Sequence, residues 1–166
     1  MTVTYSSYLH LDELLAAQQP LSQGPEHDEM LFIVIHQVYE LWFKQLLHEA
    51  AHLGAALEQD ELPRVYATLK RFLTILKVQV AQIDILETMS PVSFLSFRAR
   101  LDTASGFQSP QFRELEFVLG RRSARMIAHH AGTPAADRLA AMLYEPSLWD
   151  QFVQFLVRHG YGVPQE

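Results

Sequence analysis

The most conspicuous group of chemically capable residues is a pair of histidines with a glutamate between them, His48, Glu49 and His52. Histidines four positions apart share one face of a helix. Zinc peptidases use this spacing to hold a metal ion, and the glutamate activates its bound water. The helical phase favours another interpretation, because the leucines and alanines of the same stretch form the apolar stripe. We therefore predict that the three side chains lie on a solvated helix face, with a zinc hydrolase as an alternative function.

A further histidine, His36, follows an unbroken apolar run at positions 30–35. This position predicts a buried imidazole, which needs a hydrogen-bond partner. One interpretation is a core histidine bonded to a carbonyl or carboxylate group. The other is a polar group that projects into an apolar pocket, because Phe32 lies one turn earlier on the same helix face and could line a cavity with it.

Arg98 has an aromatic residue one position before it, Phe97, and another four positions before it, Phe94. Its stem can lie along apolar surface with the guanidinium in water. Alternatively, its planar guanidinium group can form a bidentate pair with the carboxylate of an amino acid or another organic acid. Taken together, the residues favour a helical protein that holds an aromatic, anionic ligand.

The composition narrows the function classes. The 166 residues include no cysteine, which excludes disulfides, thiolate nucleophiles and thiolate metal ligands. The net charge of −6, with no basic cluster longer than Arg121-Arg122, makes nucleic acid an unexpected partner. No apolar stretch approaches the roughly 18 residues of a membrane-spanning helix, and the N-terminus lacks a leader pattern. We expect a cytoplasmic protein that does not associate with membranes.

Proline and glycine fall almost wholly between segments of helical periodicity, which predicts an all-α protein with a single helical domain over residues 1–166. Two long helices should form its centre. A hydroxyl residue followed by proline marks three later helix starts, because the hydroxyl caps the first turn. The expected elements are an opening segment at Tyr5–Gln18, a loop at Leu21–Glu26, long helices from near Asp28 to about Glu58 and from Asp60 past Ile83, helix starts at Ser90, Ser109 and Thr133, a small-residue loop at Leu101–Gln108, and a last helix from Glu145–Ser147 to His159–Gly160.

Several longer motifs occur in the order in which tryptophan 2,3-dioxygenases carry them. They are Tyr5 with Tyr8-Leu9 and Leu11-Asp12, the run His27-Asp28-Glu29-Met30-Leu31-Phe32, His36-Gln37 with Glu40-Leu41-Trp42, Phe97-Arg98, Ser105-Gly106-Phe107-Gln108-Ser109, Glu116-Phe117 with Leu119-Gly120, and Pro146-Ser147-Leu148 with the closing segment from Gly160 to Pro164. On these motifs, which cover nearly the whole chain, the sequence resembles the tryptophan 2,3-dioxygenase family.

The resemblance implies a helical bundle of the tryptophan and indoleamine dioxygenase type. It implies a dioxygenase with haem b as its cofactor. The enzyme would insert both atoms of O2 across the indole C2–C3 bond of L-tryptophan to give N-formylkynurenine. In that family Phe32 would pack against the indole, His36 would hydrogen-bond its N–H, and Arg98 would hold the substrate carboxylate. Phe94 would belong to the same substrate site, and Ser105 and Gly106 would lie with Phe32 against the haem.

The resemblance also implies an oligomer, expected to be a homotetramer. Residues 1–26 would reach into a neighbouring subunit, where Tyr5, Tyr8 and Leu9 would complete the substrate site. Residues 27–166 would form the distal part of the haem-binding bundle.

Three positions depart from the family pattern: Ile35 stands where glutamine is usual, Phe94 where tyrosine is usual, and Ile83 where tryptophan is usual. The family's axial histidine lies beyond the region of resemblance, so no metal ligand is expected among these residues. The interpretations left open are a fragment, a split enzyme completed by a complementary C-terminal chain, and a haem-free, non-catalytic domain that binds an aromatic amino acid or a partner.

Overall fold

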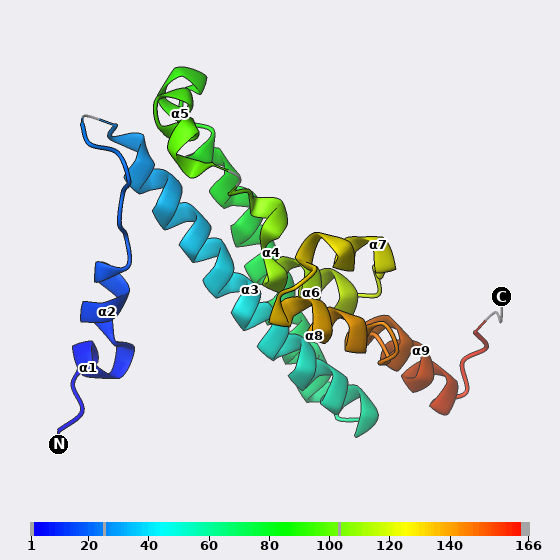
Figure 1. Cartoon of the computed structure of the whole chain (residues 1–166). Helices are drawn as coiled ribbons and strands as arrows, with labels where there is room; N and C mark the ends of the chain where they lie inside the picture. The colour runs from blue at the N-terminus through cyan, green and yellow to red at the C-terminus, as the bar shows by residue number, and fades with distance from the viewer. Residues whose placement is uncertain (1, 25, 103, 164–166) are drawn as a thin grey trace. The chain divides into compact units, whose positions relative to one another are not determined.

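The computed structural model describes residues 2–24, 26–102 and 104–163, and all regular structure in these ranges is helical (Figure 1). The prediction of an all-α protein with two long helices is therefore confirmed. The α-helices are α1 (Tyr5–Leu9), α2 (Leu11–Ala16), α3 (Asp28–Glu58), α4 (Leu62–Leu86), α5 (Pro91–Arg98), α6 (Pro110–Val118), α7 (Ala124–Ile127), α8 (Pro134–Met142) and α9 (Leu148–Arg158). Short 3-10 turns occupy Ala99–Leu101, Gly106–Gln108 and Ala128–His130.

The chain divides into two compact units. The first contains the residues up to Val38 together with Gln82–Ala104, and the second contains Tyr39–Ala81 and the residues from Ser105 onward. Helices α3 and α4 each contribute residues to both units. The sequence-based expectation of one domain stays a prediction.

Hydroxyl caps explain why the shorter helices begin where they do. The Ser90 hydroxyl accepts the Ser93 N–H at 3.0 Å, and the Ser109 hydroxyl accepts the Phe112 N–H at 3.1 Å, with a proline at the first helical position each time. Both predicted starts are confirmed. Thr133 also precedes a helix, but its hydroxyl donates to the His130 carbonyl oxygen at 2.7 Å.

Two predicted boundaries shift because a residue adopts left-handed backbone. Asp60 has φ of 57°, so α4 starts at Leu62 instead of Asp60. His10 has φ of 50°, which divides the expected opening segment into α1 and α2. A left-handed residue interrupts the hydrogen bonding of a helix. The hydrophobic periodicity of a sequence does not reveal such a residue unless it is a glycine.

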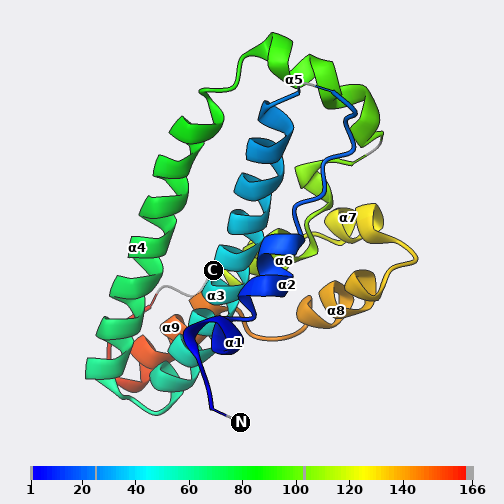
Figure 2. The same cartoon turned by 90° about the vertical axis from the view of Figure 1, so that its left-hand side faces the viewer.

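In the second unit, α3 and α4 pack together around a core of Leu46, Ala50, Phe72, Ile75 and Leu115. The Tyr39 hydroxyl donates to the Gln79 carbonyl oxygen at 2.5 Å and links the same two helices. Helix α9 covers the end of α3 through a second cluster, which consists of Leu53, Leu57 and Phe155 (Figure 2).

In the first unit, the N-terminal segment is tied to α3 by Glu29, which is only 1% exposed. Its carboxylate accepts the Leu21 N–H at 2.7 Å and the Ser22 N–H at 2.9 Å. Burial acts to raise the pKa of Glu29. The hydrogen bonds from Ser22 and Leu21, together with the Arg100 charge, outweigh it and hold that pKa below its ordinary value.

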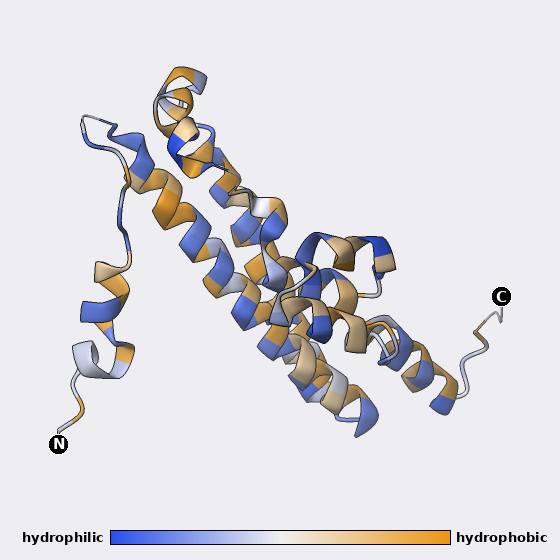
Figure 3. Cartoon of the chain, viewed as in Figure 1, coloured by the Kyte–Doolittle hydropathy of each residue, from blue (hydrophilic) through white to orange (hydrophobic). Residues whose placement is uncertain are grey.

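Polar and apolar residues interleave along the helices (Figure 3). Among the described residues, no helix combines the length and hydropathy that crossing a membrane would require.

We expect Glu29→Gln to reduce the free energy of unfolding by about 1–3 kcal/mol at neutral pH, since it removes charge-assisted hydrogen bonds to a buried acceptor. Because the folded-state pKa is lowered, this stabilisation is present above the ordinary glutamate pKa and decreases as the pH falls through the folded-state value. Urea unfolding at several pH values measures the effect. The exposed Glu87→Gln serves as the control, and a Glu29→Gln difference that is unchanged in acid would contradict the assignment.

Candidate ligand-binding site

Four rings from two helices of the first unit form an aromatic cluster, defined here as Phe32, His36, Phe94 and Phe97. The helical period places His36 one turn after Phe32, and their ring centroids lie 4.1 Å apart. Helix α5, started by the Ser90 cap, places Phe94 and Phe97 at 5.6 Å with nearly perpendicular rings. Phe32 joins the two helices, with its centroid 5.9 Å from that of Phe94 and 5.5 Å from that of Phe97.

The members of the aromatic cluster differ in exposure. Phe97 is fully buried, whereas Phe32, His36 and Phe94 are half-buried. The apolar run predicted a buried His36, but the side chain is only half-buried. The imidazole needs no distant partner, because Nδ1 bonds the Phe32 carbonyl oxygen of its own helix at 2.7 Å.

This bond determines the tautomer of His36. A carbonyl oxygen can only accept a hydrogen bond, so Nδ1 carries the proton, and Nε2 of the neutral ring presents a lone pair. Among the residues that the structure describes, none donates to Nε2. His36 can therefore accept one hydrogen bond from the N–H group of a ligand.

Arg98 lies half-buried at the end of α5. Its Nη1 donates to the Asp102 carbonyl oxygen at 3.0 Å, and it forms no salt bridge with any described residue. The nearby Arg100 differs, because it lies 3.4 Å from a Glu26 carboxylate oxygen. Arg98 thus retains an uncompensated charge, and the N–H groups of its planar guanidinium suit a carboxylate.

The other predicted site residues lie elsewhere in the chain. Tyr5 and Tyr8 of α1 are 77% and 75% exposed, and Leu9 is also exposed, so none is buried against the aromatic cluster. Ser105 and Gly106 belong to the second unit, where the Ser105 hydroxyl accepts the Phe107 N–H and Gly106 opens a 3-10 turn. Open space surrounds the position that a Cβ of Gly106 would occupy. The proposed roles of these five residues stay predictions.

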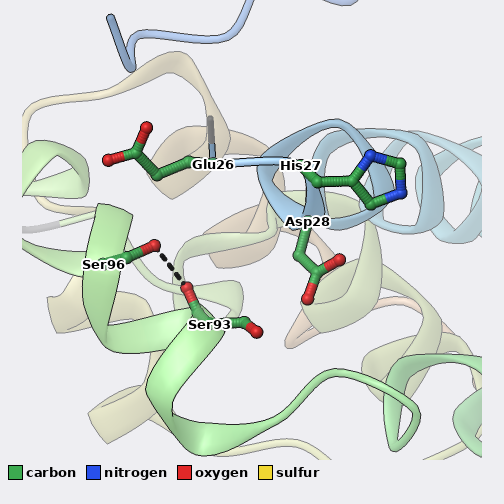
Figure 4. Close-up of a pocket in the computed structure, with 5 residues that line it drawn as sticks. All are labelled: Glu26, His27, Asp28, Ser93 and Ser96. Carbon is green, nitrogen blue, oxygen red and sulfur yellow. Dashed lines mark hydrogen bonds between the residues drawn. The ribbon is translucent and has the colours of Figure 1, made fainter. Parts of the chain in front are cut away.

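The first unit also contains a cavity of about 260 Å³, lined by residues of polar type, that the sequence did not predict (Figure 4). Its lining joins Glu26, His27 and Asp28, at the start of α3, with Ser93 and Ser96 of α5. Oε2 of Glu26 is buried without a partner among the described residues. Carboxylates and hydroxyls suit an indole ring poorly, and only folding brings these residues from distant segments together.

Comparison with known proteins identifies the family to which this arrangement belongs. The family described as Tryptophan 2,3-dioxygenase matches residues 1–145. The chain belongs to this family.

Individual relatives match almost the entire chain. A protein named tryptophan 2,3-dioxygenase from Herpetosiphon aurantiacus is 54% identical over 164 residues, which cover 99% of this chain and 63% of that relative. A protein of the same name from Anaeromyxobacter sp. strain K is 56% identical over 163 residues, which cover 98% of this chain and 61% of the relative. The chain therefore spans less than two thirds of the length of these relatives.

The three departures from the usual pattern of tryptophan 2,3-dioxygenases lie in different surroundings. Ile35 is buried, at 6% exposure, whereas Ile83 is 45% exposed. Phe94 packs edge-on against Phe97 within the aromatic cluster. Each apolar side chain stands where the family pattern usually has a residue able to form a hydrogen bond.

The histidine and glutamate motif of α3 has a mixed outcome. His48 and His52 are exposed, as predicted, but the prediction for Glu49 is wrong because this residue is only 3% exposed. Its carboxylate accepts hydrogen bonds from Gln45 at 2.7 Å and from Arg71 of α4 at 3.0 Å. Arg71 compensates the buried charge, which helical phase within α3 could not reveal. Within the described ranges, no three metal-ligating side chains come together.

We expect Phe97→Ala to reduce the free energy of unfolding by about 3–5 kcal/mol, because it removes a fully buried ring from the aromatic cluster. Phe94→Ala should cost less than half as much, since that ring is half-buried. The exposed Phe107→Ala is the control. Chemical denaturation measures all three, and equal losses for Phe94→Ala and Phe97→Ala would contradict the packing described.

Proposed function

We propose that this chain forms the substrate-binding side of a haem-dependent dioxygenase. The reaction would add both oxygen atoms of O2 across the indole C2–C3 bond of L-tryptophan to give N-formylkynurenine. Membership of the tryptophan 2,3-dioxygenase family supports this function. The observation that carries it is the aromatic cluster, in which Nε2 of the half-buried His36 is open to a hydrogen-bond donor. Arg98, the residue after Phe97 of this cluster, has no acidic partner among the described residues.

The chemistry of L-tryptophan matches these groups. The indole ring would stack beside Phe32 and Phe94, and its N–H would donate to Nε2 of His36. The substrate carboxylate would accept two hydrogen bonds from the guanidinium of Arg98. Hydrogen bonds to a charged group contribute about 1.5–3 kcal/mol each, so Arg98 would supply much of the orientation and affinity.

The residues present also fit one face of a haem. Phe32 and Phe94 offer half-exposed rings against which a flat, apolar macrocycle can lie. On family membership alone, we propose that Ser105 and Gly106 also contact the haem. When bound, haem would supply the iron that binds and activates O2. We propose that its axial ligand comes from the portion of the family's sequence that this chain does not match.

The chain's own residues would act chiefly by positioning the substrate. Arg98 and His36 would hold opposite ends of one molecule, which fixes the position of the indole C2–C3 bond and lowers the entropic part of the barrier. Because Nδ1 of His36 is held protonated by the Phe32 carbonyl group, Nε2 would accept the indole N–H without a prior change of tautomer.

We also propose a homotetramer in which α1 enters a neighbouring subunit's site. The large exposed fractions of Tyr5 and Tyr8 support this arrangement, because aromatic side chains exposed on a five-residue helix are typical of an interface. A complementary chain that supplies the rest of the family's sequence would act in the same assembly.

Haem titration tests the proposed function. In the presence of the portion of the Herpetosiphon relative that lies outside the match, we expect a Soret band that L-tryptophan shifts. Arg98→Ala should weaken that tryptophan effect at least about tenfold, because it removes the carboxylate partner. Arg125→Ala, at an exposed arginine of the second unit, is the matched control.

The absence of a Soret band with both parts present would overturn the haem assignment. Calorimetric binding of L-tryptophan to the haem-free chain, lost in Arg98→Ala, would then favour a non-catalytic domain that binds an aromatic amino acid. Equal tryptophan effects in wild type and Arg98→Ala would remove Arg98 from the site.

The role of His36 has its own test. 1-Methyltryptophan lacks the indole N–H, so the wild-type chain should bind it less tightly than L-tryptophan, by about tenfold. His36→Ala should weaken L-tryptophan binding and reduce the preference to near unity. A preference that persists in His36→Ala would show that another group accepts the indole N–H.

A further inference from the structure

The second unit contains a cavity of about 400 Å³ where the 3-10 turn Ala128–His130 leads into α8. We refer to it as the α8 cavity. Its ionisable lining residues are His129, His130 and Arg138, and no acidic side chain of the described residues lines it. In a chain whose net charge is −6, such a lining favours an anion over a cation.

The N-terminus of α8 opens into the α8 cavity without a side-chain cap. Pro134 and Ala135, the first two residues of the helix, line the cavity. The Thr133 hydroxyl, at the position predicted to cap the helix, donates instead to the His130 carbonyl oxygen at 2.7 Å. The Ala135 N–H consequently has no acceptor among the described residues. A free N–H group at the positive end of a helix dipole suits an anion.

His130 is a second observation that points to a ligand, and it is independent of the helix. The side chain is only 4% exposed although it lines the α8 cavity, and Nε2 is buried without a partner among the described residues. Buried polar groups are nearly always hydrogen-bonded, so an imidazole without a partner in the protein is suited to bond a ligand. In either neutral tautomer, and in the charged form, the ring carries an N–H that can donate to an anion.

Arg138 supplies a charged group at the same cavity. It lies one turn after Pro134, on the same face of α8. Its Nε donates to a Glu114 carboxylate oxygen at 2.9 Å, which limits the freedom of the guanidinium. The other N–H groups of Arg138 bond no described residue, and two of them can pair with the two oxygens of a carboxylate.

We propose that the α8 cavity binds the carboxylate group of a small organic acid. The carboxylate would lie at the N-terminus of α8 and accept hydrogen bonds from the Ala135 N–H, His130 and Arg138. A volume of about 400 Å³ falls within the roughly 300–1,000 Å³ of small-molecule sites, so an organic body would fill the remainder beside Pro110 and Pro134. The inference goes beyond the tryptophan chemistry, because it uses neither the aromatic cluster nor Arg98.

Benzoate and benzamide test the proposal, because the two molecules have nearly the same shape and differ in charge. In the 166-residue chain with 13C-labelled histidine, benzoate should shift the ring resonance of His130 saturably. Benzamide should bind at least about tenfold more weakly. The His130 resonance is identified as the one that His130→Gln lacks. Equal affinity for the two molecules, or no saturable shift with benzoate, would overturn the proposal.

Arginine variants provide the second arm of the test. Arg138→Gln should weaken benzoate binding at least about tenfold, whereas Arg64→Gln should leave it within about twofold. Arg64 is a matched control because its side chain is 52% exposed, against 56% for Arg138, and each arginine pairs with a glutamate. Benzoate binding that is unchanged in Arg138→Gln would overturn the assignment.

Thr133→Asp tests the role of the helix N-terminus without removing a buried side chain. Its carboxylate would cap α8 and occupy the site, so benzoate affinity should fall at least about tenfold while circular dichroism shows the helices intact. Inorganic phosphate that binds more tightly than benzoate would overturn the choice of an organic acid. Loss of the benzoate shift in Arg98→Ala would also overturn the proposal, because benzoate would then occupy the proposed tryptophan site.

Discussion

The unbroken course of α3 is the constraint on which the described structure depends. The helix runs for 31 residues, and its residues belong to both compact units. One helical period orients Phe32 and His36 in the first unit and Leu46 and Ala50 in the second. A break anywhere in α3 would change the phase of the residues beyond it, so the aromatic cluster and the core depend on the same run of backbone hydrogen bonds.

The candidate site depends partly on local structure, as at His36, and partly on contacts between distant segments, as at Arg98. The tautomer of His36 is set locally, since its partner is a carbonyl group one turn away on the same helix. The availability of Arg98 depends on its surroundings in the fold. Arg100 lies 3.4 Å from a Glu26 carboxylate oxygen, whereas Arg98 forms no salt bridge with a described residue. The guanidinium of Arg98 is thus available to the carboxylate of a ligand, which is the role that we propose for it.

Buried carboxylates perform a structural role throughout this acidic chain. Glu29 accepts two backbone N–H groups of the N-terminal segment, and Glu49 pairs with Arg71 between α3 and α4. Glu116 of α6 pairs with Arg121 at 3.0 Å and also with Arg113. An unpaired buried charge is costly, so each carboxylate is paired. Glu29 and Glu49 tie α3 to other segments, whereas Glu116 pairs within α6 and with Arg121 just after it.

The sequence by itself determined the features that depend on residues within a turn or two of one another. It predicted the caps at Ser90 and Ser109, the shared face of Phe32 and His36, and the motifs by which the family is identified. Only the tertiary structure decided that Glu49 is buried, because its partner comes from another helix. The cavity beside Ser93 and the exposure of apolar side chains such as Tyr66 and Leu73 on α4 were likewise decided there. Local periodicity shows that a helix has an apolar face, but whether another segment covers that face depends on how distant parts of the chain pack.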